Sequence, residues 1–279
     1  MIPEPIVSII TPTFNRVALL EETVDSILAQ DFGAFEYLIV DDGSSDGTGA
    51  YLSGLEDPRI RVLSQENSGE VVAINRAWHE ARGRYVAIVS SDDPMADNWL
   101  GEVVAALERD DATVVAYPDW KFIDEHGYTL QILRTPEYSL FDMVADFRAQ
   151  PGPGALIRRS ACGGLVGPRR AQFRFCADLD MWLQLALVGP FVRVPKILAS
   201  WRDHPGSATT MERNRHRADE LIALAYDFFS RPGLPIEVEV LRARSISRAH
   251  IAAAYVAAPT DPDYAEEMKR RAAAIFPSP

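Results

Sequence analysis

The sequence predicts an α/β protein: a mostly parallel sheet flanked by helices, followed by a helical C-terminal extension. Two observations predict this fold class. Over residues 1–118, short apolar runs rich in β-branched residues alternate with segments of helical period, which is the order of a parallel sheet covered by helices. From residue 211 onward, the periodic segments are all helical. With 279 residues, the chain is long enough for one large domain or two small ones.

The expected strands are short apolar runs bounded by turn residues. Two of them form a hairpin around the turn at residues 125–127. In order, the expected strands occupy residues 7–10, 37–40, 60–63, 85–89, 113–117, 120–124, 128–133, 155–157, 191–194 and 197–201.

The expected helices carry apolar residues at a period of about 3.6. The first follows a turn at Thr11–Arg16, in which Asn15 is a good N-cap. Breaks among the last helices coincide with Pro232, Pro235 and Pro259. The first expected helix runs from after residue 16 to residue 28, and the second begins at residue 48. The others are expected at 67–81, 97–109, 140–147, 177–188, 212–230, 236–257 and 262–275.

The strand at 85–89 ends directly in the polar turn Ser90–Asp93, and Pro94 stops any continuation. In an open parallel sheet, ligands bind in the crevice at the carboxyl ends of the strands. The adjacent carboxylates of Asp92 and Asp93 repel each other unless a positive charge lies beside them. A divalent cation that also holds phosphate oxygens is therefore a natural ligand. The alternative is a solvated turn, because Ser, Asp and Pro are common loop residues.

Two more polar turns, Thr11–Asn15 and Asp41–Asp46, follow strands at the same edge. A carboxylate after the second strand can accept hydrogen bonds from a ribose hydroxyl or a base N–H. Asp41 is the more core-facing of the acidic pair, Asp42 suits the capping of a turn, and Gly43 permits close approach of a ligand to the backbone. The alternative is an Asp-Gly-Ser turn that caps the next helix.

The segment Gly43–Gly47 also fits the Gly-x-Ser-x-Gly pattern of a hydrolase nucleophile elbow, with Asp178 and His204 following in suitable order. Only one strand is expected before the strand that leads into this segment, however, where a hydrolase sheet needs several, and the sequence has no His-Gly-Gly-type oxyanion loop. The segment fails as a calcium loop, because Ser44 takes a ligand position and no Glu follows at the required distance. Phosphate loops of the types Gly-x-x-x-x-Gly-Lys and Gly-x-Gly-x-x-Gly are absent from the sequence.

Later in the chain, Asp178 and Asp180 stand two residues apart near a helix start. They point in different directions, so one can face a cleft while the other interacts with the helix dipole. Stabilisation of the dipole alone is the simpler interpretation of both. Further on, Arg202, His204 and Ser207 follow a strand together, a group that suits a diphosphate or a metal ion.

Composition limits the function classes. The net charge is −12, and the acid excess lies within residues 1–210, which hold 30 acids against 18 Lys and Arg. This excess disfavours a nucleic-acid partner and suits a site that recruits cations, although a merely acidic surface is commoner. Cys162 and Cys176 lack metal-like spacing, and the sequence shows neither a membrane-length apolar run nor a signal-peptide pattern. A reduced cytoplasmic location is expected.

Six segments match the motifs of a known family in order: Val7–Arg16, Asp41–Ser44, Asn67–Gly69, Ser91–Asp93, Ala177–Asp180 and Arg202–Ser207. Together they make the chain resemble the large inverting glycosyltransferase family 2, which has the GT-A (Rossmann-like) fold. The resemblance extends from Val7 to about Ser207 and leaves the helical tail outside. Each motif alone carries little information, whereas six in the right order are specific.

The resemblance implies a metal-assisted single displacement that moves a sugar from a nucleoside-diphosphate sugar to an acceptor hydroxyl. The acceptor is a glycan, a lipid-linked molecule or a small molecule, in cell-surface polysaccharide or glycoconjugate synthesis. By the same resemblance, Asp178 is the catalytic base, while Asp93, Asp92 and His204 hold Mn²⁺ or Mg²⁺. The implied diphosphate or acceptor contacts are Arg202, Ser207, Asp180 and Trp182. The implied nucleotide-binding residues are Thr11, Pro12, Thr13, Phe14, Asn15, Asp41, Asp42, Asn67, Gly69, Asn75, Ser91 and Asp92.

Three departures from the family pattern leave room for another function. Ser90 stands where many relatives have an acid, and Ile74 precedes Asn75 where an Arg often contacts the base. Ala177 stands where the family frequently has a Glu beside the catalytic base, and Asp180 can take the place of that Glu. The alternative function is a catalytically weak nucleotide-sugar-binding protein that acts through its helical tail.

The expected organisation has three parts: a donor-binding half at 1–118, an acceptor-binding half with the base at 119–210, and a helical extension at 211–279. Arg-rich helix faces in the extension suit packing on the main domain, a homodimer, or contact with a lipid-linked acceptor at the inner membrane face. Packing is the default expectation. The sequence leaves the sugar, the nucleotide and the acceptor unnamed.

Overall fold

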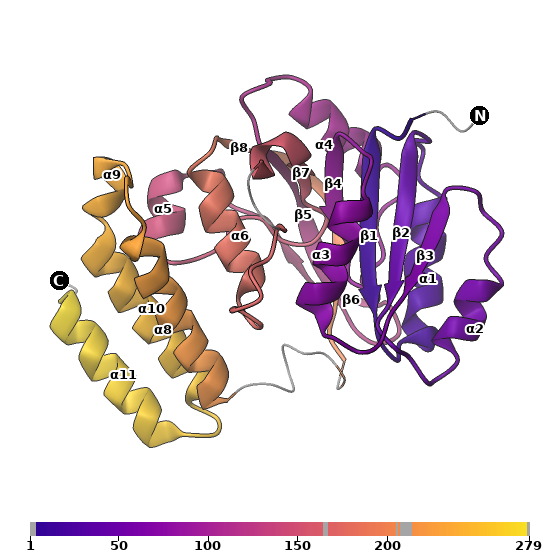
Figure 1. The fold of residues 1–279 in the computed structure, drawn as a ribbon. Coiled ribbons are helices and arrows are strands. Elements are labelled where there is room, and N and C mark those ends of the chain that lie inside the picture. The colour runs from indigo at the N-terminus through magenta and orange to yellow at the C-terminus, as the bar shows by residue number, and fades with distance from the viewer. Residues whose placement is uncertain (1–3, 164–166, 205, 207–213, 278–279) are drawn as a thin grey trace. The chain divides into compact units, whose positions relative to one another are not determined.

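The computed structural model describes residues 4–163, 167–204, 206 and 214–277. These residues form two compact units, each made of separate stretches of chain. The sheet unit comprises the described residues of 1–137, 151–169 and 187–203. The helical unit comprises those of 138–150, 170–186 and 204–279. The expected fold class, an α/β protein with a parallel core and C-terminal helices, is confirmed (Figure 1).

The sheet unit contains one sheet of eight strands among the described residues. Its parallel half has the order β3 (Ile60–Ser64), β2 (Phe35–Asp41), β1 (Val7–Thr13) and β4 (Tyr85–Ile88). The order continues through β7 (Leu156–Arg158), β5 (Val115–Ile123) and β6 (Thr129–Leu133), and β8 (Phe191–Arg202) pairs with β5. The strands β7 and β6 are antiparallel to their neighbours, whereas β8 is parallel to β5. The parallel half brings the carboxyl ends of β1, β2 and β4 to one edge.

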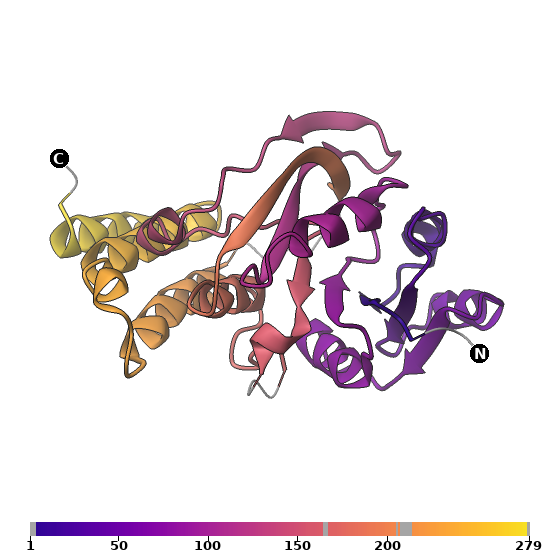
Figure 2. The ribbon, with the colours of Figure 1, turned by 90° about the horizontal axis from the view of Figure 1, so that it is seen from above.

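Helices cover both faces of the parallel half (Figure 2). On one face, α1 (Val17–Leu28) and α4 (Trp99–Leu107) share a core with alternate residues of β1 and β2. On the other face, α3 (Glu70–Glu80) packs on the same two strands. The remaining helical segments are α2 (Thr48–Ser53) and the 3₁₀ helix η1 (Arg159–Cys162). Because both faces are covered, residues on both sides of β1 and β2 are buried, including the polar Ser8 and Glu36.

The helical unit contains α5 (Leu140–Ala145), α6 (Ala177–Ala186), α8 (Arg215–Ser230), α9 (Ile236–Glu239), α10 (Arg242–Ala257) and α11 (Pro262–Ile275). The long helix α10 packs against both α8 and α11. Small side chains at this contact, among them the fully buried Ala218, Ala253 and Ala257, let the helices pack closely. In the described part of the chain, no helix has the length and apolar character that crossing a membrane demands.

Several expected strand boundaries are wrong because strands continue through polar residues or proline. The first strand does not turn at Thr11 but pairs with β2 as far as Thr13. The expected strands at 113–117 and 120–124 form the single strand β5, which shifts its register beside Pro118. Proline removes a backbone donor, and the irregularity at that point lets the strand continue. The segments at 191–194 and 197–201 likewise form one strand, β8.

Two helix expectations are also wrong. The helix expected over 236–257 is divided into α9 and α10, with a break at residues 240–241. Asn15 does not cap α1, because Arg16 occupies the N-cap position. Asn15 instead has a positive φ of 52°, and its side chain bonds the loop that follows β2.

A buried carboxylate joins the first strands of the sheet. Glu36 on β2 accepts hydrogen bonds from Ser8 Oγ at 2.7 Å, from Arg61 Nη1 at 3.1 Å and from the Arg82 N–H at 2.7 Å. Ser8 Oγ in turn accepts the Gly83 N–H at 2.8 Å. Burial alone would raise the pKa of Glu36, but the hydrogen bonds from Arg82, Ser8 and Arg61 outweigh it and lower that pKa. Ionised Glu36 therefore stabilises the fold.

We expect Glu36→Gln to lower the free energy of unfolding at pH 7 by about 2–3 kcal/mol, because buried donors lose a charged acceptor. The folded pKa lies below the unfolded value of 4.5, so the stabilisation is complete above that value and is lost as the pH falls through the folded pKa. Urea unfolding between pH 7 and about pH 3 should show wild type and variant converging in acid. Glu80→Gln, which removes an exposed partner of Arg61, is the control and should change stability by less than about 0.5 kcal/mol. A difference that is constant across this pH range would contradict the assignment.

Candidate active site

The loops that follow β1 and β2 are joined by side chains at the carboxyl edge of the sheet. The Asn15 N–H donates to Ser44 Oγ at 2.9 Å, and Asn15 Oδ1 accepts the Ser45 N–H at 2.7 Å. Asp46 accepts the N–H of Val17 at 3.2 Å. These bonds make the two loops one polar rim, comprising residues 13–17 and 44–46.

Two residues of the polar rim are suited to a ligand. Phe14 exposes 43% of its surface. Thr13 is buried, and its Oγ1 is one of three buried side-chain atoms, among the described residues, that have no hydrogen-bond partner. A buried hydroxyl without a partner costs free energy, and a ligand group at this point would recover it. This geometry supports the prediction that Thr13 and Phe14 contact a nucleotide.

Two other predicted nucleotide contacts are occupied within the protein. Thr11 is fully buried in β1, and its Oγ1 accepts a hydrogen bond from Tyr37 Oη at 3.1 Å. Asn75 on α3 donates from Nδ2 to the Arg169 carbonyl at 2.7 Å and accepts the Arg169 N–H at 3.2 Å. Both side chains therefore have partners within the protein, and their contacts with a nucleotide stay predictions. Pro12, between two buried threonines, is half-buried.

The acidic pair after β2 anchors the surrounding turns. Asp41 Oδ1 accepts the Ser44 N–H at 3.0 Å. The buried Asp42 carboxylate accepts three hydrogen bonds, from Gln65 Nε2 at 2.7 Å, the Ser68 N–H at 2.9 Å and the Gly69 N–H at 2.8 Å. Two carboxylate oxygens offer about four acceptor sites, so most of the capacity of Asp42 is used by the protein. Its main structural effect is to fix the loop that leads into α3.

Gly43 allows this loop packing. Its φ is +82°, and a Cβ at this position would lie 2.9 Å from the backbone nitrogen of Asn67. The protein's own chain therefore makes a close backbone approach at Gly43. The Asn67 side chain itself is exposed beside this contact.

The acidic turn after β4 holds a buried charge. Asp93 is 5% exposed, and its Oδ1 accepts the Arg202 N–H at 2.8 Å. Burial raises the pKa of Asp93 well above its ordinary value, and the neighbouring Asp92 carboxylate raises it further. Hydrogen bonds from the Arg202 N–H and the Ser90 side chain oppose this shift. Asp92 Oδ2 lies 4.0 Å from the guanidinium of Arg16.

Arg202 positions the acidic turn. Its guanidinium is buried and donates from Nε to the Asp92 carbonyl at 3.0 Å. The same group donates from Nη1 to the carbonyls of residues 124 and 125, at 3.1 and 3.2 Å, and from Nη2 to the Glu22 carboxylate. With these donors engaged, the geometry favours a positioning role over the diphosphate or acceptor contact predicted for Arg202.

The acidic turn suits a cation that takes most of its ligands from a substrate. Among the described residues, no three His, Cys, Asp or Glu side chains gather as a metal site. Asp92 and Asp93 supply two hard carboxylates, and Mg²⁺-type ions are commonly bound by one or two carboxylates together with substrate phosphates and water. The high cost of ionising Asp93 in the metal-free protein is what a bound cation would offset. The two residues therefore fit the predicted cation.

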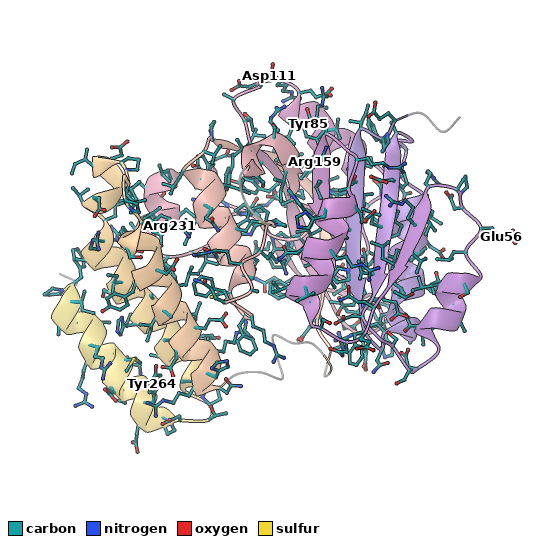
Figure 3. The ribbon with its side chains drawn as sticks, in the orientation of Figure 1. Glu56, Tyr85, Asp111, Arg159, Arg231 and Tyr264 are labelled. Carbon is teal, nitrogen blue, oxygen red and sulfur yellow. The ribbon has the colours of Figure 1, made fainter. Side chains whose placement is uncertain are left out.

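In the helical unit, Asp178 and Asp180 face different surroundings, as the sequence predicts. Asp178, in the first turn of α6, is exposed, and its Oδ1 accepts the Leu179 N–H at 2.7 Å. Asp180 is fully buried and accepts two hydrogen bonds from Arg170, at 2.8 and 2.6 Å. Arg231, which follows α8 (Figure 3), donates to the same carboxylate at 3.2 Å. Asp178 is thus the carboxylate that this helix presents outward.

The remaining predicted residues are the diphosphate or acceptor contacts Asp180, Trp182 and Ser207 and the metal ligand His204. Asp180 and Trp182 are buried on the inner side of α6, and their contacts with substrate stay predictions. His204 Nδ1 accepts the Gly206 N–H at 3.2 Å. Ser207 lies outside the described residues.

Sequence reasoning missed the residues that hold α6. Glu220 and Asp227 on α8 accept hydrogen bonds from the chain that precedes α6, including Arg170. One signal was available, since Glu220 lies four residues before the buried Leu224 and so places a charge on the apolar face of α8. A carboxylate on such a face needs donors inside the protein.

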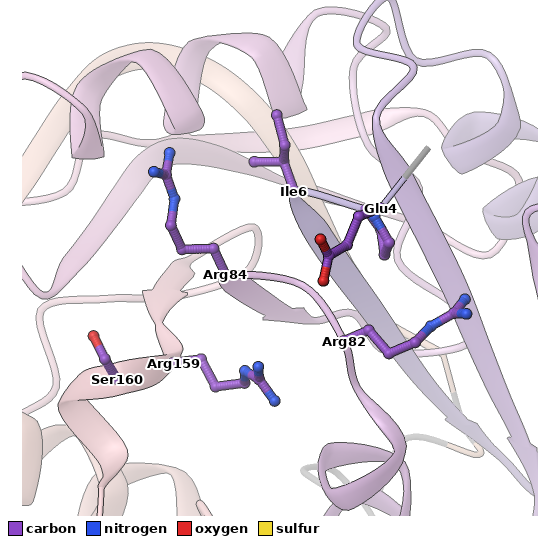
Figure 4. A pocket seen from close by; sticks show the side chains of 7 residues that line it. Glu4, Ile6, Arg82, Arg84, Arg159 and Ser160 are labelled. Carbon is purple, nitrogen blue, oxygen red and sulfur yellow. The ribbon is translucent and has the colours of Figure 1, made fainter. Parts of the chain in front are cut away.

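A hollow in the sheet unit is separate from these residues. It lies at the amino ends of β1 and β4, the edge opposite the acidic turn, whereas ligands of such sheets bind at the carboxyl ends. Figure 4 shows the Glu4 carboxylate among its arginines, and two of these are already paired with carboxylates. This hollow is therefore not the predicted donor site. Its lining consists of Glu4, Pro5, Ile6, Arg82, Arg84, Arg159 and Ser160.

Comparison with known sequences places the site in a family context. Residues 8–164 match the family described as Glycosyl transferase family 2. The chain is 34% identical over 191 residues to the glycosyltransferase TuaG of Bacillus subtilis, whose name refers to teichuronic acid biosynthesis, and the alignment covers 67% of this chain and 74% of TuaG. It is 36% identical over 125 residues to the glycosyltransferase GlyG of Streptococcus pneumoniae, with 44% of this chain and 42% of GlyG covered.

Solved structures share the fold. TarS of S. aureus (residues 1–349), in complex with UDP-GlcNAc, matches with a TM-score of 0.74 at 17% identity, covering 95% of this chain and 79% of that chain. The mannosyltransferase PcManGT of Pyrobaculum calidifontis, in complex with GDP-Man and Mn²⁺, matches with a TM-score of 0.68 at 20% identity, covering 99% and 76%. At these identities, the likeness establishes the fold.

We expect Asp93→Asn to raise the free energy of unfolding of the metal-free protein at pH 7 by about 1 kcal/mol or more, since one pKa unit corresponds to about 1.4 kcal/mol. The amide keeps an oxygen for the Arg202 N–H and removes the buried charge. The folded pKa lies above the unfolded value of 3.8, so the wild type loses stability as the pH rises between the two, and the gain should shrink toward pH 4. Denaturant unfolding with a chelator present checks this, with Asp178→Asn as the exposed control. A loss of stability in Asp93→Asn would show that the buried charge is already compensated.

Proposed function

The chain belongs to glycosyl transferase family 2, and from this premise we propose that it moves a sugar from a nucleoside-diphosphate sugar to an acceptor hydroxyl by a metal-assisted single displacement that inverts the anomeric configuration. The observation that carries the proposal is the acidic pair of the half-buried Asp92 and the buried Asp93, held by Arg202 at the carboxyl edge of a parallel sheet. Two like charges side by side cost free energy, and a phosphate-bound cation at this ligand-binding edge would offset that cost.

The donor binds, in this proposal, to the half formed by residues 1–118. The polar rim supplies Thr13, Phe14 and Asn15, and the exposed Asn67 and the turn at Ser91 lie on the same half. Relatives of the same fold were solved with UDP-GlcNAc and with GDP-Man, which supports a nucleoside-diphosphate sugar and leaves both uridine and guanosine as candidates.

Asp92 and Asp93 would hold the cation, with His204 as the further predicted ligand. The PcManGT complex contains Mn²⁺, which supports Mn²⁺ or Mg²⁺ here. When bound, such an ion offsets the negative charge that grows on the departing diphosphate. Arg202 does not bind the cation itself. Its hydrogen bonds to the Asp93 carboxylate and the Asp92 carbonyl hold the turn and so fix the positions of the two acids.

Asp178 acts as the general base in the half formed by residues 119–210. Its exposed carboxylate takes the proton of the acceptor hydroxyl while that oxygen forms a bond to the anomeric carbon. The bond between the anomeric carbon and the diphosphate oxygen breaks on the opposite face, and its electron pair leaves with the diphosphate. A single displacement of this kind inverts the configuration.

The acceptor is a glycan, a lipid-linked molecule or a small molecule of cell-surface polysaccharide synthesis, a role supported by the name of TuaG. We place the reaction in the cytoplasm, because Cys162 and Cys176 are free thiols. The extension at 211–279 serves mainly to support the helical unit, in which α8, α10 and α11 pack on one another.

We expect binding of UDP, GDP or dTDP to depend on a divalent cation. Isothermal titration of the three nucleotides, with and without Mn²⁺, should show one of them bound at least about tenfold more tightly with the ion, since the ion bridges carboxylate and phosphate. Asp93→Asn should remove this dependence and retain the weak metal-free binding. Equal binding of the best nucleotide with and without Mn²⁺ would refute the cation assignment.

We expect Asp178→Asn to lower the rate of transfer by about a hundredfold or more, the usual contribution of a general base. Nucleotide affinity should change less than about twofold, because binding does not use the base. Release of nucleoside diphosphate from UDP-GlcNAc or GDP-mannose, with a panel of glycan acceptors, measures the rate. Asp263→Asn is the matched control, since Asp263 is also an exposed acid in the first turn of a helix of this unit. An unchanged rate in Asp178→Asn would exclude it as the base.

A further inference from the structure

One carboxylate of the C-terminal helices holds the chain that leads into α6. Glu220 on α8 is 9% exposed, and it accepts the N–H groups of three consecutive residues. These bonds come from Arg174 at 2.9 Å, Phe175 at 2.6 Å and Cys176 at 2.8 Å. The Cys176 thiol also donates to Glu220 Oε1, at 3.2 Å. Burial, and next the facing Glu220 carboxylate, raise the pKa of that thiol far above its ordinary value, so it remains a neutral donor.

These contacts lie directly before the exposed carboxylate of α6. The Cys176 carbonyl accepts the Asp180 N–H at 2.9 Å and so begins the hydrogen bonding of the helix. Asp178 is two residues beyond the last amide that Glu220 holds. The direction of the Asp178 side chain is therefore set by a turn whose backbone donors all end on Glu220. The negative charge of Glu220 near the amino end of α6 also interacts favourably with the dipole of that helix.

A second group of ion pairs holds the other parts of the same segment. Arg170 binds Asp180 at 2.6 Å and Asp227 of α8 at 2.5 Å. Arg231 binds Asp180 at 3.2 Å and Asp227 at 3.5 Å. The segment from residue 170 to 180 is thus tied to α8 both before and after Asp178, and the side chain of Asp178 itself is left exposed.

We propose that Glu220 is a positioning residue for the transfer step, through which helix α8 sets the direction of the Asp178 carboxylate. The proposal rests on the proposed function of Asp178 as the base. A carboxylate that collects three adjacent backbone donors fixes an irregular turn in one geometry, which a reacting group requires.

The test compares Glu220→Gln with Glu220→Asp in the full-length enzyme. Glu220→Gln keeps the size of the side chain, removes its charge and turns an NH₂ group toward the backbone donors. It should lower kcat by about ten- to a hundredfold, the scale that a misplaced reacting group costs. The KM for UDP-GlcNAc or GDP-mannose and the affinity for the nucleotide should change less than about twofold, because the donor contacts are elsewhere. Glu220→Asp retains the charge and should lose less activity than Glu220→Gln.

A double-mutant cycle separates positioning from general damage. If Glu220 acts through Asp178, Glu220→Gln should add no further loss of rate to Asp178→Asn. Amide hydrogen exchange should also increase at residues 174–176 in Glu220→Gln, whatever the activity. Asp219→Asn is the control on α8, because Asp219 contacts Tyr264 and Arg215 and does not touch the segment before α6. It should lower the melting temperature and leave kcat unchanged.

The outcomes distinguish the two assignments. An unchanged rate in Asp178→Asn overturns the base and, with it, the positioning role. A lowered rate in Asp178→Asn together with an unchanged kcat in Glu220→Gln overturns the positioning role alone. Equal losses from Glu220→Gln in both backgrounds also overturn it, since Glu220 would then act independently of Asp178. If Glu220→Gln fails to fold, the same comparisons are made with Glu220→Asp.

Discussion

The arrangement of the sheet unit depends on one electrostatic constraint: two adjacent carboxylates, Asp92 and Asp93, lie in the turn after a buried strand and repel each other. Arg202 relieves part of this repulsion, with its N–H on Asp93 and its guanidinium on the Asp92 carbonyl. This requires the end of β8 to lie beside the turn after β4, although β8 and β4 are not neighbours in the sheet. The long parallel pairing of β8 with β5 brings Arg202 to that point. The extended second half of the sheet thus supports the acidic turn of the first half.

The same chemistry recurs where irregular segments need a fixed geometry. Asp42 accepts backbone donors before α3, Glu36 accepts the N–H of Arg82 before β4, and Glu220 accepts those before α6. Hydrogen bonds to a charged acceptor are about twice as strong as neutral ones, so a single buried carboxylate can order several residues without regular secondary structure. These buried carboxylates also bear on the interpretation of the acidic composition. Part of the acid excess behind the net charge of −12 lies inside the protein as loop anchors and does not form a surface that attracts cations.

The sequence predicts what depends on local period and residue type. The strand–helix alternation is sufficient for the fold class, and helical geometry is sufficient for the opposite environments of Asp178 and Asp180. The partners of polar side chains are different, because they are set by tertiary contacts. Arg202 bonds Glu22 across 180 residues, and Asn75 bonds Arg169 across 94 residues. A motif gives the residue type that a ligand would need, but it does not reveal whether a distant backbone group already occupies that residue.

The position of these contacts along the chain suggests how donor and acceptor functions are divided. The acidic turn belongs to the sheet unit, whereas Asp178 and Glu220 belong to the helical unit. A physical reason exists for this division. Nucleoside-diphosphate sugars share their diphosphate, whereas acceptors differ in shape, and a base must be placed to suit its acceptor. Because α8 holds the segment of the proposed base through contacts within the helical unit, we expect a change in α8 to redirect Asp178 and to leave the hydrogen bonds of the acidic turn in place. The C-terminal helices are therefore the part of the chain in which we expect acceptor preference to be encoded.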